Sequence, residues 1–132
     1  MRTDYAEAVL EVASLVARGS AVSYGDVAEL LGAGGPRQVG AAMARSGGHG
    51  GRSVPWWRVV RSNGTLPADL AVDAAARWAE EGTPLRNGHV AMPEARWRPT
   101  QEDFAAIDAL AERLRLRERQ RVAEPKRRAP LL

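Results

Sequence analysis

The chain has 132 residues, of which 45% are hydrophobic and 27% charged, and its formal net charge is +3. This length and composition predict one soluble globular domain, with or without a tail, and argue against a disordered chain. The chain contains no cysteine, which excludes a disulfide framework, a thiolate metal site and a cysteine nucleophile.

The first predicted helix covers residues 4–18. Asp4 and Glu7 are spaced as a capping pair at its start, and Gly19 is a suitable residue to follow its end. Its buried stripe consists of four residues at helical spacing: Tyr5, Val9, Val12 and Val16.

Two short helices joined by a glycine-rich turn come next. Ser23 and Asp26 form a looser version of the capping box, so a helix is expected from there to Leu31. Residues 32–35 contain three glycines and turn the chain, and Pro36 begins a helix that ends near Arg45. This pattern predicts a helix-turn-helix. The small residues of the second helix fit either close packing against its own core or a recognition helix in a DNA groove.

A β-hairpin is predicted after these helices. Residues 58–61 form its first strand, Asn63 and Gly64 its turn, and residues 65–66 its return strand, because Asn-Gly suits a type I′ turn. A hairpin in this place makes the predicted fold mainly α with a small β-hairpin, that is, a winged helix-turn-helix DNA-binding domain.

The remaining chain predicts two more helices. Asp69 is expected to cap a helix over residues 70–81, which Gly82 ends, and residues 83–99 look irregular apart from a short strand at 89–91. A last helix is predicted from Gln101 to Val122, with Thr100 and Asp103 at its start. Eight lysines and arginines but two glutamates lie between positions 113 and 128. This segment is either an electrostatic arm for DNA or a solvated end. The predicted division is a domain over 1–99 and a C-terminal helix and basic tail over 100–132.

Three blocks, SYGDVAELLG, PRQVGAAM and VPWWRVVRSNGTL, resemble the DNA-binding domain of O6-alkylguanine-DNA alkyltransferases. Those enzymes have a cysteine that accepts the alkyl group, and Trp56 stands in its place here. The chain is therefore similar to the alkyltransferase-like proteins, the non-enzymatic relatives. It departs from the pattern in having Trp57 where histidine is usual, so that Glu81, at the place of the relay carboxylate, is expected to be structural. It also lacks an arginine in residues 66–69.

The resemblance implies binding of O6-alkylguanine lesions in duplex DNA by base flipping, without alkyl transfer, and flagging of the lesion for nucleotide excision repair proteins. The alternative is a winged-helix transcription regulator with a specific operator. The expected partners are lesion-containing double-stranded DNA and repair proteins. We expect a monomer that is cytoplasmic, or nucleoid-associated if bacterial, with no membrane partner, cofactor, metal or catalytic residue.

The resemblance also implies the site residues. Tyr24 pushes on the phosphate beside the target and Arg37 fills the gap in the stack, although both also fit a core tyrosine and a solvated arginine. Trp56 is either a wall for the flipped base or a core residue. The expected DNA-binding residues are Ser23, Tyr24, Arg37, Gln38, Gly40, Ala41 and Arg45, with Arg52 a further candidate for a phosphate contact. The expected lesion-pocket residues are Tyr24, Met43, Val54, Pro55, Trp56 and Val59.

Overall fold

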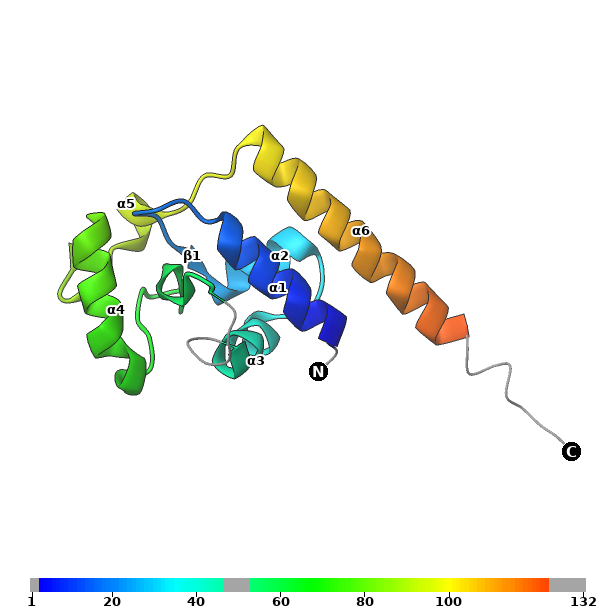
Figure 1. Cartoon of the computed structure of the whole chain (residues 1–132), viewed down its shortest axis with the longest axis horizontal. Coiled ribbons are helices and arrows are strands. Elements are labelled where there is room, and N and C mark those ends of the chain that lie inside the picture. The colour runs from blue at the N-terminus through cyan, green and yellow to red at the C-terminus, as the bar shows by residue number, and fades with distance from the viewer. Residues whose placement is uncertain (1–2, 47–52, 124–132) are drawn as a thin grey trace, which may run out of the picture.

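The computed structural model describes residues 3–46 and 53–123. Its helices are α1 (Thr3–Leu15), α2 (Tyr24–Leu31), α3 (Pro36–Ser46), the 3-10 turn η1 (Trp56–Arg58), α4 (Ala68–Glu81), α5 (Met92–Ala95) and α6 (Gln101–Ala123). Its strands are β1 (Val22–Ser23), β2 (Val59–Val60), β3 (Leu85–Arg86) and β4 (His89–Val90). Helices α1 to α3 form the centre of the molecule, and α4 and the end of α6 lie at opposite sides (Figure 1). The expectation of a mainly helical fold is confirmed.

The helix-turn-helix prediction is confirmed by the caps of its helices. The Ser23 hydroxyl accepts the Asp26 N–H at 3.0 Å, and the Asp26 carboxylate accepts the Ser23 N–H at 3.2 Å, which is a complete capping box. Gly32 ends α2 in the left-handed conformation with a φ of 67°. The Tyr5 hydroxyl of α1 donates to the Ala33 carbonyl at 2.8 Å and ties α1 to the turn. Helix α1 itself ends at Leu15, earlier than predicted.

The predicted hairpin at Asn63-Gly64 is wrong. The turn exists, since the Gly64 N–H donates to the Arg61 carbonyl at 2.8 Å, but Thr65 and Leu66 form no strand. Strand β2 instead pairs in parallel with β1, with Val59 opposite Val22. Gly64 is held elsewhere: its carbonyl accepts the N–H of Val90, and a Cβ on Gly64 would lie 2.0 Å from the Val90 oxygen.

The second Asn-Gly pair makes the hairpin that the first does not. Asn87 and Gly88 have φ angles of 54° and 85°, as a type I′ turn requires. They join β3 to β4 in an antiparallel pair, with Leu85 opposite Val90. This part of the chain was expected to be irregular apart from one strand, so the prediction is corrected here too.

Helices α4 and α6 have nearly the predicted bounds. Pro67 occupies the cap position of α4 without a side-chain bond, so Asp69 lies in the first turn instead of capping it as predicted. There its negative charge still interacts favourably with the positive end of the helix dipole. Gly82 ends α4 with a φ of 71°, as expected. At the start of α6, the Thr100 and Asp103 side chains accept each other's backbone N–H at 3.0 and 2.9 Å, which confirms that start.

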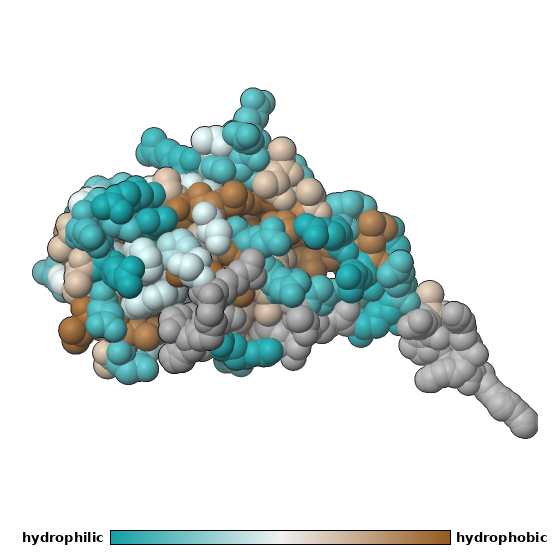
Figure 2. Space-filling view, viewed as in Figure 1, coloured by the Kyte–Doolittle hydropathy of each residue, from teal (hydrophilic) through white to brown (hydrophobic). Residues whose placement is uncertain are grey.

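Helix α6 packs its first half against α1 and α2 through the buried Ile107, Leu110 and Ala111. Beyond Leu114 every described residue of α6 is exposed, and the helix projects past the start of α1 (Figure 1). Figure 2 shows mainly hydrophilic residues over this outer part of α6. Among residues 3–46 and 53–123, no helix is both long and apolar enough to cross a bilayer.

Candidate nucleic-acid interface

A cavity of about 510 Å³ lies where α2, α3, the η1–β2 segment and the start of α4 meet. Eleven residues line it: Tyr24, Gly40, Met43, Ala44, Trp56, Val59, Arg61, Leu66, Pro67, Asp69 and Leu70. Four of the six predicted pocket residues are among them. The other two, Val54 and Pro55, lie in the chain just before Trp56 and do not line it. The pocket walls are mostly apolar, as small-molecule sites usually are.

Tyr24 and Gly40 form one side of this cavity by direct contact. A Cβ on Gly40 would lie 3.4 Å from the Tyr24 ring, which is van der Waals contact, so the ring lies directly against α3 at this glycine. Burial raises the pKa of the Tyr24 phenol, an effect that the positive charge of Arg61 reduces in part. The phenol is therefore a neutral hydrogen-bond donor at physiological pH.

Arg61 and Asp69 are the charged residues among the cavity's lining, and neither was among the predicted pocket residues. Both are exposed, and Arg61 also donates to the Thr65 hydroxyl at 3.3 Å. Residues 66–69 contain no arginine, as noted above, but Arg61 supplies a guanidinium to the same cavity from the end of β2.

Helix α3 separates its buried and exposed residues clearly. Val39, Ala42 and Met43 are buried in the core, which accounts for part of its small-residue content. The exposed residues are Pro36, Arg37, Gln38, Ala41, Ala44 and Arg45. The Gln38 side-chain oxygen accepts the Gly35 N–H at 2.9 Å and so is partly used within the protein. The helix therefore offers an open face with an arginine at each end, and the second predicted use of α3, as a recognition helix, stays a prediction.

The start of α2 offers fewer free donors than expected. Ser23 is 4% exposed, and its backbone N–H is taken by Asp26, whose carboxylate also pairs with Arg96. The N–H groups of Ser23 and Asp26 are therefore both taken within the capping box and are not available to an anion. Arg52 lies outside the described residues.

Trp56 rests on Trp57. Their ring centres are 5.7 Å apart and the planes are nearly perpendicular, at 88°, which is a favourable edge-to-face contact. Trp57 itself does not line the cavity. The guanidinium groups of Arg77 and Arg58 lie 4.3 and 5.4 Å from the centre of its ring. Its carbonyl accepts the Trp78 indole N–H at 2.8 Å.

Glu81 binds both Trp57 and Arg58, and its side chain is 3% exposed. It accepts the Trp57 indole N–H at 2.9 Å, two Arg58 donors at 2.6 and 3.1 Å, and the Gly19 N–H at 3.1 Å. Burial raises the pKa of this carboxyl, but the hydrogen bonds from Arg58, Gly19 and Trp57 outweigh burial and hold the pKa below 4.5. This geometry agrees with the expected structural role of Glu81.

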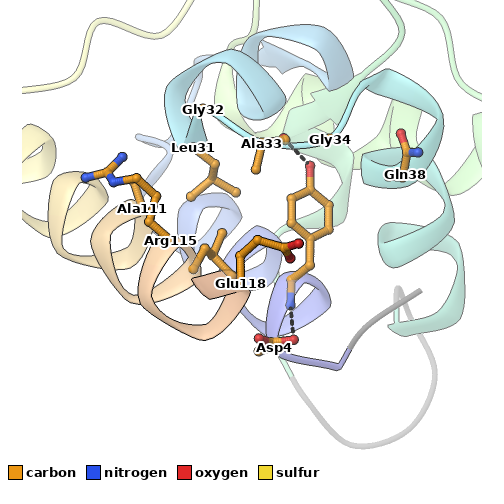
Figure 3. A pocket seen from close by; sticks show the side chains of 11 residues that line it. Asp4, Leu31, Gly32, Ala33, Gly34, Gln38, Ala111, Arg115 and Glu118 are labelled. Carbon is orange, nitrogen blue, oxygen red and sulfur yellow. Dashed lines mark hydrogen bonds between the residues drawn. The ribbon is translucent and has the colours of Figure 1, made fainter. Parts of the chain in front are cut away.

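A second cavity, of about 490 Å³, lies between α1, the α2–α3 turn and α6. Tyr5 lines this cavity, and its hydroxyl donates to the Ala33 carbonyl. Figure 3 shows Gln38 of α3 and Arg115 of α6 on different sides of the cavity. Arg115 of α6 and Gln38 of α3 thus line the same cavity. Within the described residues, no cluster of three or more histidine or acidic side chains could hold a metal ion.

The helix-turn-helix, with a tryptophan-walled cavity beneath its second helix, defines the class as a DNA-binding domain. Residues 4–82 match the family described as 6-O-methylguanine DNA methyltransferase, DNA binding domain. The chain belongs to this family and is an alkyltransferase-like protein within it.

Relatives and solved structures agree with this assignment. Proteins named DNA base-flipping protein, from Escherichia coli (strain K12) and Shigella flexneri, are each 32% identical over 99 residues, or 70% of this chain and 74% of theirs. S. pombe Atl1 in complex with damaged DNA containing O6-carboxymethylguanine is 29% identical and superposes with a TM-score of 0.64. A second S. pombe ATL–DNA complex is 31% identical, with a TM-score of 0.62. Each match covers 75% of this chain and all of the S. pombe chain.

Proposed function

We propose that this protein binds O6-alkylguanine in duplex DNA by flipping the damaged base into the cavity beneath α3, and that it transfers no alkyl group. The observation that carries this proposal is the 510 Å³ cavity, which is lined by Trp56, the residue that the motif resemblance aligns with the acceptor cysteine. An indole presents an apolar face on which a base can stack but offers no thiolate. The whole chain contains no cysteine that could replace it.

The proposal gives separate roles to Tyr24 and Arg37. Tyr24 begins α2 and leans on Gly40, where its ring and the neighbouring N–H groups meet the phosphate beside the flipped nucleotide. Arg37 is exposed in the first turn of α3 and enters the duplex in place of the missing base. The bound complex then marks the lesion for nucleotide excision repair proteins.

Binding to a labelled duplex with one O6-methylguanine tests the proposal against the same duplex with guanine. We expect tighter binding of the damaged duplex by about 5- to 150-fold, since stacking of a base on an aromatic ring contributes about 1–3 kcal/mol. Mass spectrometry of the protein after the incubation should give an unchanged mass. Equal affinity for the two duplexes would refute lesion binding, and a gain of one methyl group would refute the non-enzymatic role.

The arginine-rich half of α6 (residues 112–123) is expected to add contacts to the DNA backbone. It has five arginines and two glutamates, and its ion pairs are exposed and therefore weak. Arg115 lines the cavity that also contains Gln38 of α3, so this side of α6 adjoins the expected DNA face. Arg113 and Arg117 instead share a groove with Glu7 and Glu11 of α1.

A pair of double variants with equal charge tests this arm. Arg115→Gln with Arg119→Gln should lower the salt dependence of binding by a slope of about 1–2, because each lost phosphate contact removes about 0.9. Arg113→Gln with Arg117→Gln, on the α1 side, should change it less. The effect should occur on a duplex of several turns and disappear on one of about a single turn of 10 bp. The same loss on both duplexes, or from both double variants, would contradict the arm.

A further inference from the structure

Trp57 is held more tightly than a side chain outside the cavity needs to be. Its indole N–H donates to the buried Glu81 at 2.9 Å, its ring lies 4.3 Å from the Arg77 guanidinium, and its carbonyl is bonded by Trp78. Glu81 is in turn fixed by Arg58 and by the backbone of Gly19. The ring of Trp57 therefore cannot shift without breaking contacts to α4 and to the segment that follows α1.

Trp56 has no comparable side-chain anchor in the described structure. Its indole makes no hydrogen bond to residues 3–46 or 53–123, and its side chain is half-buried between the two hydrophobic clusters of the protein. One cluster belongs to α1–α3 and α6, and the other to α4 and α5. One side of Trp56 faces the cavity. Another side makes the edge-to-face contact with Trp57, with 5.7 Å between the ring centres. The position of this cavity wall thus depends on the ring beside it.

We infer that Trp57 is a positioning residue that fixes Trp56 and so sets the size of alkyl group the cavity admits. This inference rests on the proposed function. A large, immobile ring beside Trp56 keeps it from receding when a longer alkyl group enters. Protein interiors are close-packed, so removal of that ring leaves space into which Trp56 can move. Size selection in an apolar pocket is typically about 10- to 200-fold per methylene, which leaves room for a measurable change.

The test compares duplexes with O6-methylguanine and O6-benzylguanine, and its readout is the ratio of their affinities. Trp57→Leu should shift this ratio toward the benzyl lesion by about fivefold or more, since a 1 kcal/mol change alters an equilibrium about fivefold. Trp57→Phe keeps a ring against Trp56 but loses the bond to Glu81, so its ratio should lie between those of the unmodified protein and Trp57→Leu. Trp97→Leu is the matched control. Trp97 is buried in the cluster of α1–α3 and α6, whereas Trp57 packs against the cluster of α4 and α5, and Trp97 does not line the cavity.

Arg77→Ala keeps the test decisive if Trp57→Leu fails to fold. Arg77 is exposed, and its removal loosens only the contact on the Trp57 ring, so a smaller shift in the same direction is expected. An unchanged ratio in Trp57→Leu and Arg77→Ala, with lesion binding retained, would overturn the positioning role of Trp57 but not the proposed function. An equal shift in Trp97→Leu would also overturn it, because general loosening would then explain the result. Equal binding of damaged and undamaged duplex by the unmodified protein would instead refute the proposed function.

Discussion

Replacing Arg37 with alanine is expected to lower the affinity for a duplex containing O6-methylguanine by about 10- to 100-fold, and that for undamaged duplex by about threefold or less. The flipped state loses stacking and pairing that amount to a few kcal/mol, and a side chain inserted into the gap restores part of them. In undamaged duplex Arg37 contributes only a charge near phosphate, which is worth less. Fluorescence anisotropy with both duplexes at one fixed salt concentration measures the two losses.

Arg45→Ala is the matched control for this experiment. Arg45 is exposed on the same helix, in its last turn, and the substitution removes the same side chain. A phosphate contact serves both duplexes alike, so the loss should be equal for damaged and undamaged DNA. If Arg37→Ala also weakened both duplexes by the same factor, its insertion into the stack would be refuted.

The helices were predictable because their signals are local. The capping box of Ser23 and Asp26, the left-handed Gly32 and the reciprocal Thr100–Asp103 bonds each involve residues within three positions or one turn. Such signals depend on the chain itself and need no distant partner. They predicted the bounds of α1 to α4 and of α6 to within a few residues.

The strands depended on distant partners, and the sequence did not reveal these. Both Asn-Gly pairs carry the same hairpin signal, yet one forms a hairpin between β3 and β4 and the other does not. At Asn63-Gly64 the backbone of Gly64 bonds to Val90, and β2 already pairs with β1 some 37 positions earlier in the chain (Val59 against Val22). Choosing between the two pairs requires knowing these long-range contacts.

The residues of the candidate site were likewise predicted only in part. The motif resemblance named Tyr24, Met43, Trp56 and Val59, which do line the cavity. It missed the residues of the segment from β2 to α4, including Arg61, because that segment was expected to return as a strand. One available signal was overlooked at Trp57: an indole N–H is a donor and can serve Glu81 much as a ring nitrogen of histidine would.

Replacing Glu81 with alanine is expected to lower the free energy of unfolding by about 3–5 kcal/mol, a large fraction of the stability of a small domain. The change leaves the Arg58 guanidinium, which is 15% exposed, without its counter-ion, and it leaves the Trp57 and Gly19 N–H groups without an acceptor. Glu80→Ala is the matched control. Glu80 is the exposed neighbour on the same turn, so its loss should cost less than about 0.5 kcal/mol. Urea unfolding at pH 7 measures both values, and equal values for the two variants would contradict the anchoring role.

Glu81→Gln then tests whether the charge of this carboxylate carries the effect. The pKa of Glu81 is lowered in the folded protein, so folding favours the ionised form. Its contribution should be complete above the ordinary carboxyl pKa of 4.5 and should be lost as the pH falls through the lower pKa of the folded state. The unmodified protein should therefore lose more stability than Glu81→Gln between pH 7 and pH 3, as followed by urea unfolding. Parallel pH profiles for the two proteins would mean that Glu81 acts through shape and neutral hydrogen bonds, and not through its charge.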